Sequence, residues 1–294
     1  MILVIGATGT VGRLVLRQLT ARGEQVRALV READTARQRV GDRVGYVVGD
    51  LDRPATLAPA LAAANRVFLL TRQSDRQPEQ ERAVVDAAVR AGVRHLVKLS
   101  VFRADERSPL QIARQHALTE RAVQESGLGY TIVRPVFFMQ NLPGMIRDGA
   151  IRTAAEDGRV AMVDVRDVAA VAVDALTSYG NEDRTYTVTG PQAVTFDAAA
   201  ATLSRETGDP VRHVHVAPDL VRAALERNAV AGWFARDMAR LQSMLADGYE
   251  DVVTDDVHTV TGTAPHTLAE FCRDLVNRPR PAYPDAAAGS LRAT

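Results

Sequence analysis

The chain has 294 residues, of which 46% are hydrophobic, and its formal net charge is zero. That length and composition predict a globular protein of one large or two smaller domains, and the charge balance argues against nucleic acid as the main partner. Cys272 is the single cysteine, which excludes an intrachain disulfide, and the lack of a charged leader or of an apolar run of about 18 residues predicts a cytoplasmic protein without membrane spans.

The N-terminal segment combines an apolar strand, three evenly spaced glycines and an apolar helix. Residues 1–5 are apolar, Gly6, Gly9 and Gly12 follow, and a helical pattern covers residues 11–21. A tight turn after a strand needs the backbone freedom of glycine, and a main chain close to a pyrophosphate needs positions without a Cβ. This order predicts a dinucleotide-binding turn whose helix amides point at the phosphates. A glycine-rich turn with only a structural role is the alternative.

The second predicted strand, residues 25–30, ends at Arg31. In a dinucleotide-binding fold this strand end faces the adenosine ribose, where an acidic residue is typical of NAD and an arginine accommodates the 2′-phosphate of NADP. Arg31 therefore favours NADP, with Arg13 as a second positive charge near the same phosphate. Glu32 keeps NAD open as the less favoured cofactor, and either arginine could simply be solvated.

Short apolar strands alternate with helical patterns through the first half of the chain. Beyond the first two strands, the predicted strands are residues 44–48, 66–70, 94–100 and 130–134, and the predicted helices are residues 77–90 and 109–126. Such alternation predicts an α/β protein with a Rossmann-type doubly wound parallel sheet and helices on both faces.

The loops at the carboxyl ends of these strands form the edge where such sheets bind ligands. Asp50 follows the third strand and is expected at the adenine edge. A helix start is the alternative there, because Pro54 opens the next helix and Asp52 could cap it. The loop that begins with Thr71 and Arg72 follows the fourth strand and is expected to face a ligand.

After residue 151 the pattern loosens. The predicted strands are residues 160–163, 185–189 and 211–216, and the predicted helices are residues 168–177, 196–207, 218–228, 231–246 and 267–276. We expect an NADP-binding Rossmann domain at residues 1–150, with residues 160–180 packing back on it, and a smaller mixed α/β C-terminal substrate lobe at residues 181–278. Residues 279–294 are rich in proline and alanine, which predicts a disordered tail.

Apolar and amide side chains mark a predicted substrate pocket. The segment that leaves the sixth strand contains Phe137, Phe138 and Asn141, which we expect to line a pocket over the nicotinamide. Phe102 and Trp233 are further candidates for this lining. Trp233 also fits the apolar face of a helix, so ordinary packing is the alternative.

Two histidines lie on one face of the strand predicted at residues 211–216. His213 and His215 are two positions apart, and strand side chains alternate between faces. A metal would need a third ligand, and none is evident in the sequence, so we predict no metal site.

Several motifs occur in a characteristic order along residues 1–277. They are Gly6-Ala-Thr-Gly-Thr-Val-Gly12, Arg31, Gly49-Asp-Leu51, Ala91-Gly-Val-Arg-His95, Ser108-Pro-Leu110, Val253-Thr-Asp-Asp256 and Thr261-Gly262. Together they resemble the NmrA-like atypical short-chain dehydrogenases, and within that family the NAD(P)H:quinone oxidoreductases. The segment from Ser108 to Glu120, with its His-x-x-Thr-Glu pattern, is the closest local match.

The resemblance implies roles for the matching positions. Phosphate contacts are implied for the glycine turn, the 2′-phosphate contact for Arg31, adenine contacts for Asp50 and Leu51, and nicotinamide contacts for Thr71 and Pro135. The full predicted cofactor set is Gly6, Thr8, Gly9, Thr10, Val11, Gly12, Arg31, Asp50, Leu51, Thr71, Arg72, Ser100 and Pro135.

The chain departs from the resemblance in its proton donor. Classical members use a Tyr-x-x-x-Lys pair, but Lys98 is the only lysine and Arg94 stands four positions before it, so that pair cannot exist here. His116 stands approximately where some relatives place a lysine, and with a pKa near 6.5 it could donate a proton to a substrate oxygen. A partly exposed surface histidine is the alternative.

These observations favour an NADPH-dependent reductase that transfers a hydride to a quinone, an enone or an aromatic carbonyl compound. A non-catalytic NADP(H)-binding redox sensor is an alternative, because it would also lack the catalytic pair. A tailoring reductase of secondary metabolism is another. The expected partner is a small aromatic molecule rather than nucleic acid or membrane, and a homodimer stays open.

Overall fold

The computed structural model describes residues 1–277 and divides the chain into two compact units. Unit 1 comprises residues 1–108, 113–134 and 166–187, and unit 2 comprises residues 109–112, 135–165 and 188–277 of the described chain. Both units are thus discontinuous in sequence. The predicted division was residues 1–150, with residues 160–180 packing back on them, and residues 181–278. The tail predicted at residues 279–294 lies outside the described residues.

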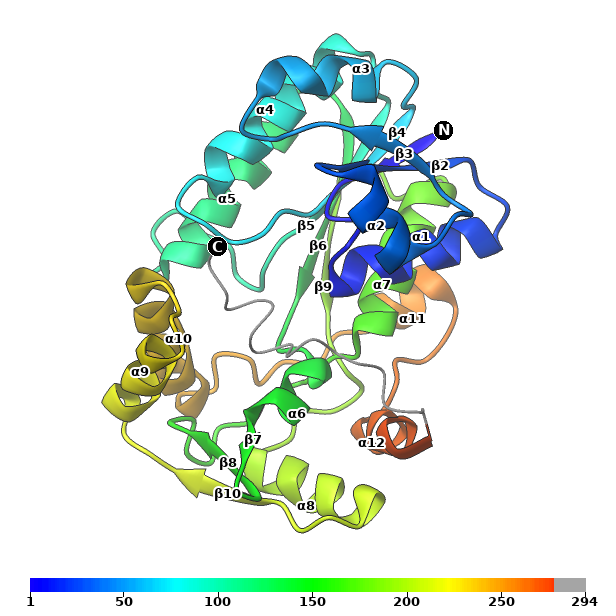
Figure 1. Cartoon of the computed structure of the whole chain (residues 1–294). Helices are drawn as coiled ribbons and strands as arrows, with labels where there is room; N and C mark the ends of the chain where they lie inside the picture. Colours follow the sequence, from blue (N-terminus) through cyan, green and yellow to red (C-terminus); the bar gives the residue numbers. More distant parts are fainter. Residues whose placement is uncertain (278–294) are drawn as a thin grey trace. The chain divides into compact units, whose positions relative to one another are not determined.

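Unit 1 is organised around a seven-stranded sheet (Figure 1). The strands lie in the order β3-β2-β1-β4-β5-β6-β9, and the neighbours from β3 to β6 pair in parallel. Their bounds are β1 Ile2–Val4, β2 Val26–Val30, β3 Gly45–Val48, β4 Arg66–Leu69, β5 His95–Leu99, β6 Gly129–Pro135 and β9 Arg184–Val188. The predicted doubly wound α/β sheet is confirmed, and its order reverses between β1 and β4.

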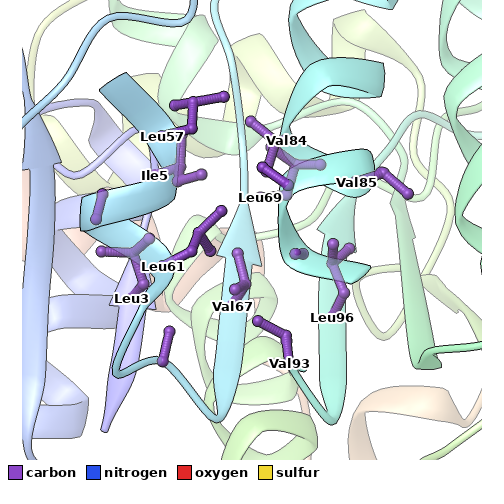
Figure 2. Close-up of a cluster of buried hydrophobic side chains, with 14 of the residues drawn as sticks. Leu3, Ile5, Leu57, Leu61, Val67, Leu69, Val84, Val85, Val93 and Leu96 are labelled. Atoms are coloured by element: carbon purple, nitrogen blue, oxygen red, sulfur yellow. The ribbon is translucent and has the colours of Figure 1, made fainter. Parts of the chain in front are cut away.

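Helices cover both faces of this sheet (Figure 1). They are α1 Thr10–Ala21, α2 Ala33–Val40, α3 Leu57–Leu61, α4 Gln77–Arg90, α5 Gln111–Gln124 and α7 Val165–Thr177. Figure 2 shows how side chains of α3 and α4 pack on alternate strand residues such as Leu3, Val67 and Leu96. Each fully buried Leu or Val contributes roughly 1.5–3 kcal/mol, so this layer fixes the strand ends from which the site is built.

Unit 2 holds a small mixed sheet of three strands in the order β10-β8-β7. The strands are β7 Ile146–Arg147, β8 Ala150–Thr153 and β10 Arg212–His215, with β10 parallel and β7 antiparallel to β8. The helices are α6 Leu142–Met145, α8 Phe196–Thr207, α9 Pro218–Arg227, α10 Gly232–Ala246, α11 Asp256–Thr261 and α12 Leu268–Asn277. Within residues 1–277, none of the helices is long and apolar enough to span a bilayer.

The structure differs from the sequence analysis in one predicted strand and in one hairpin that was not predicted. The strand predicted at residues 160–163 is wrong, because Val160 and Val163 make only isolated bridges to Val194 and Phe138. The hairpin of β7 and β8 was not predicted. In its turn, Asp148 and Gly149 have positive φ angles of 52° and 64°. A buried apolar run therefore becomes a strand only where a partner strand continues the ladder.

Candidate cofactor site

The turn between β1 and α1 requires glycine at two positions. Gly6 has a φ of +78°, and a Cβ there would lie 2.4 Å from the main-chain oxygen of Leu70. A Cβ at Gly12 would lie 2.1 Å from the main-chain oxygen of Gly6. The turn folds tightly against the end of β4 and against itself. A larger residue at Gly6 or Gly12 would therefore clash with the main chain.

The helix that follows has an N-terminus suited to an anion. α1 begins at Thr10, its N-cap is Gly9, and among the described residues no side chain caps it and no acidic residue occupies its first turn. The first amides of a helix have no intrahelical partner, and the helix dipole favours negative charge at this end. The turn also lies where the strand order reverses between β1 and β4, which is where open α/β sheets bind ligands.

The end of β2 presents an arginine. Arg31 is exposed, and within residues 1–277 the structure gives it no hydrogen-bond or ion-pair partner. The neighbouring Glu32 accepts a hydrogen bond from the hydroxyl of Thr35 at 3.0 Å. The basic side chain at this strand end is therefore available to a ligand, while the acidic one already has a partner.

Asp50 lies in the loop after β3. Its Oδ1 accepts the backbone N–H of Asp52 at 3.0 Å, and its own N–H donates to the hydroxyl of Thr56 at 2.9 Å. The alternative that Asp52 caps the helix opened by Pro54 is wrong. A short 3-10 helix, Pro54–Thr56, begins there, its N-cap residue is Arg53, and within residues 1–277 no side chain makes a capping hydrogen bond to it. Asp52 instead pairs with Arg76 at 2.8 Å.

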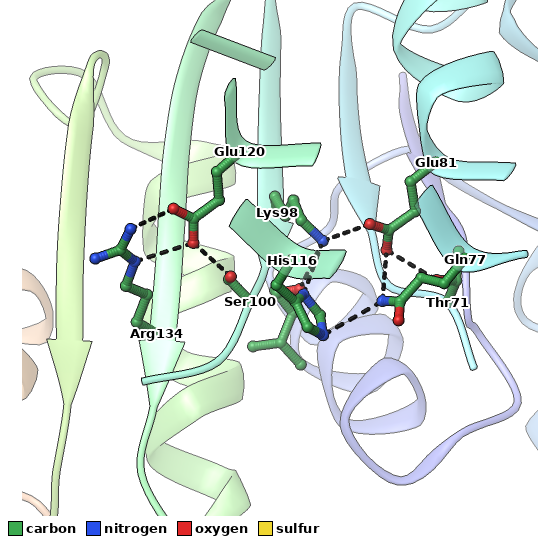
Figure 3. Close-up of polar contacts among 9 residues, drawn as sticks. Thr71, Gln77, Glu81, Lys98, Ser100, His116, Glu120 and Arg134 are labelled. Carbon is green, nitrogen blue, oxygen red and sulfur yellow. Dashed lines mark hydrogen bonds and ion pairs between the residues drawn. The ribbon is translucent and has the colours of Figure 1, made fainter. Parts of the chain in front are cut away.

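Two predicted cofactor contacts have side chains bonded inside unit 1 (Figure 3). The hydroxyl of Thr71 donates to Glu81 at 2.8 Å, and the hydroxyl of Ser100 donates to Glu120. Glu120 also accepts from the guanidinium of Arg134. These hydroxyls therefore hold the loops after β4 and β5 against α4 and α5.

The single lysine is fully buried in the same network (Figure 3). The Nζ of Lys98 donates to Glu81 at 2.7 Å, to the main-chain oxygen of Leu99 at 3.2 Å and to Nδ1 of His116 at 3.3 Å. An ammonium group has three donors and no acceptor, so all three are used. Glu81 is also fully buried, and although burial raises the pKa of its carboxyl, the Lys98 charge and the hydrogen bonds lower it overall.

His116 differs from both sequence expectations. It is 3% exposed rather than at the surface, and burial, with the nearby Lys98 charge, lowers its pKa to about 3 instead of the assumed value near 6.5. Its Nδ1 accepts from the Lys98 ammonium, and its Nε2 lies 3.3 Å from the side-chain nitrogen of Gln77. At pH 7 the ring is therefore not an imidazolium acid.

The predicted pocket residues belong to both units. Phe102 is in unit 1, with the guanidinium of Arg103 5.0 Å above its ring, while Phe137 in unit 2 packs edge-on against Phe196 at 5.7 Å. Unit 2 also contains Pro135 at the end of β6, Phe138, and Trp233 near the start of α10. Asn141, also in unit 2, ends the short 3-10 helix Met139–Asn141.

Sequence reasoning did not single out the buried glutamates Glu81 and Glu250. Glu81 stands four positions after Gln77 on the face of α4 that also buries Val84 and Val85, a polar pair on an apolar face that could have been noticed. Glu250 accepts the backbone N–H of Phe137 at 3.0 Å, and nothing in the sequence around it signals that contact.

A family model and two relatives match most of the chain. A model described as the NmrA-like family matches residues 1–271. The chain is 39% identical to an NAD(P)H azoreductase of Xenophilus azovorans over 93% of this chain and 97% of the relative. It is 44% identical to a (4-alkanoyl-5-oxo-2,5-dihydrofuran-3-yl)methyl phosphate reductase of Streptomyces griseus over 76% of this chain and 80% of the relative.

A solved structure shows the same fold. The NADPH-dependent quinone oxidoreductase of Escherichia coli, determined in complex with NADPH, superposes with a TM-score of 0.83 at 27% identity. The match covers 94% of this chain and 99% of the other.

Proposed function

The chain belongs to the NmrA-like family, and we propose that it is an NADPH-dependent reductase that transfers a hydride to a quinone, an enone or a related aromatic compound. It is an NAD(P)H-dependent oxidoreductase by its similarity to such enzymes over more than nine-tenths of its length. The relatives named for azo, furanone and quinone reduction support small conjugated molecules as the substrate class.

The observation that carries the proposal is the uncapped glycine turn at the point where the strand order reverses. The close approaches at Gly6 and Gly12 fit a chain that must pass tightly under a pyrophosphate. In this proposal the amides around Thr10 and Val11, with Thr8, bind the phosphates, and Arg31 binds the 2′-phosphate.

Other predicted contacts complete the proposed site. Asp50 and Leu51 follow β3 and would bind adenine, while Thr71, Arg72, Ser100 and Pro135 would lie near the nicotinamide. The bound cofactor supplies the hydride, and the protein supplies orientation and a shaped pocket. The chain's own contribution is therefore the fixed geometry of these strand ends.

Proton transfer sets the substrate preference that we propose. Lys98 is bonded at all three donors and His116 is neutral, so neither offers an acidic proton at pH 7. Acceptors such as quinones and conjugated enones give stable reduced products whose oxygens can be protonated by water. They suit a site without the tyrosine and lysine pair.

The test is NADPH oxidation, followed by absorbance, with a panel of quinones, enones and azo dyes. We expect turnover with NADPH in preference to NADH, and Arg31→Asp should lower kcat/KM for NADPH by about 10- to 100-fold through loss of a charge-assisted contact. Arg90→Asp makes the same charge change at the exposed end of α4 and should leave the preference unchanged. An unaltered preference in Arg31→Asp would contradict the 2′-phosphate assignment, and NADPH binding without turnover would favour a redox sensor.

A further inference from the structure

A cluster of three metal-ligating side chains lies in unit 2, apart from the strand ends that form the proposed cofactor site. His213 and His215 project from the same face of β10, and Asp197 comes from the first turn of α8. The sequence offered no third ligand for the two histidines, and the fold supplies Asp197, which stands 16 positions before His213. One atom from each side chain lies within 4.8 Å of the other two.

The separations between the ligand atoms are close to those around a small divalent cation. Nδ1 of His213 lies 2.9 Å and Nε2 of His215 lies 3.7 Å from the same Oδ2 of Asp197. In a tetrahedral zinc site with bonds of about 2.1 Å, neighbouring ligand atoms are about 3.4 Å apart. The two observed separations lie on either side of that value, and the ligand atoms of the two histidines lie within 4.8 Å of each other, so side-chain rotations could bring all three onto one ion.

The more buried histidine has an outer partner that suits metal binding. The side chain of His213 is fully buried, and its Nε2 lies 2.7 Å from the hydroxyl of Thr153 on β8. A hydroxyl can either donate or accept, so when Nδ1 binds a cation the Thr153 oxygen can accept the proton held on Nε2. Metal-bound histidines are usually oriented by such a second hydrogen bond.

The other two ligands leave the cluster open to solvent. The side chains of His215 and Asp197 are 50% and 56% exposed, so an ion could enter and keep water as a fourth ligand. A simple hydrogen bond between α8 and β10 needs only Asp197 and His213. The second imidazole aimed at the same carboxylate oxygen is what an ordinary contact does not require.

We propose that Asp197, His213 and His215 bind a divalent transition metal ion of the zinc type, which joins α8 to β10. Two neutral imidazoles and one carboxylate are the donors that such ions prefer over magnesium or calcium. The proposal is independent of the cofactor and substrate assigned above, because it uses none of those residues.

The test is titration of the chelator-treated full-length protein with Co²⁺, followed by visible absorption, and then displacement by Zn²⁺. We expect saturation at a single ion per chain and a rise in Tm with Zn²⁺. His215→Asn and Asp197→Asn alter exposed side chains, so the fold should survive, and each should weaken binding at least about tenfold. His258→Asn changes an exposed histidine on α11 and is the matched control.

Loss of Co²⁺ binding in His215→Asn and Asp197→Asn, with retention in His258→Asn, supports the site. Equal binding by all four proteins, or a lack of saturable binding by the wild type, overturns it. A Tm that rises with Zn²⁺ in the wild type but equally in His215→Asn also overturns it.

Discussion

Glu81 in unit 1 and Glu250 in unit 2 are both buried, and these two carboxyls have opposite surroundings. Glu81 in unit 1 is fully buried and lies 2.7 Å from the ammonium of Lys98, and its pKa is lowered overall. Glu250 in unit 2 is 5% exposed and accepts one backbone N–H, and burial raises its pKa to about 7. Within residues 1–277 no cation pairs with Glu250.

The contrast separates two effects that act on any buried acid. Burial raises the pKa of both carboxyls, because a charged group loses its hydration. In unit 1 the Lys98 charge, together with His116 and the hydrogen bonds from Lys98 and Thr71, outweighs that cost. In unit 2 a single amide donor does not outweigh it, so Glu250 is close to the point where it holds its proton at neutral pH.

The largest expected effect is the removal of the buried cation. Lys98→Met should lower the free energy of unfolding by about 3–5 kcal/mol at pH 7, because it leaves Glu81 as an unpaired buried carboxylate. Without the Lys98 charge, Glu81 should resemble Glu250, and its pKa should rise. The loss should therefore shrink as the pH falls and Glu81 takes up a proton. Urea denaturation of the wild type and the variant at pH 5 and pH 7 measures the loss in free energy of unfolding at each pH.

A second substitution keeps this prediction testable. Lys98→Met combined with Glu81→Gln removes both charges, and it should recover much of the lost stability while retaining an acceptor for Thr71. A loss below about 1 kcal/mol in the single variant would contradict the assigned role of the pair.

Glu250→Gln should raise the free energy of unfolding at neutral and higher pH, whereas Lys98→Met should lower it. The folded state holds the Glu250 proton up to about pH 7, whereas an ordinary carboxyl releases it near 4.5, so the folded state binds more protons between these values. Wild-type stability should therefore fall as the pH rises through this window, by about 3 kcal/mol in total. Glutamine still accepts the Phe137 N–H without a charge. The variant should be more stable than the wild type at pH 8 and equal to it near pH 4.5, and an equal difference at both pH values would contradict this reasoning.

The sequence predicted the sheet well because its signals are local. The apolar runs that became β2 to β6 are short and are separated by helical patterns, and the glycines at Gly6 and Gly12 mark a turn that permits no other residue. The run at residues 160–163 misled because a strand also depends on a distant partner. The strand ends could be proposed as a site from the sequence, because parallel topology brings them to one edge of the sheet.

Side-chain partners could not be predicted in the same way. Lys98 and Glu81 are 17 positions apart, and their contact depends on how α4 is rotated against β5. The expected pKa of His116 was wrong for the same reason, since burial and the Lys98 charge come from tertiary packing. Asp197 joins two histidines only because α8 folds back along β10.

The smallest expected effect comes from an ion pair one position away from Glu81. Arg82 and Asp86 lie on the same helix with their charged atoms 2.8 Å apart, yet their side chains are 62% and 44% exposed. Water screens such a pair, so Arg82→Ala should change the free energy of unfolding by no more than about 0.5 kcal/mol, and less at high salt. Urea denaturation under the conditions used for Lys98→Met measures it directly. The charged atoms of this pair and of the Lys98–Glu81 pair are similarly close. A loss above about 1 kcal/mol for Arg82→Ala would therefore mean that burial does not determine how much an ion pair stabilises this unit.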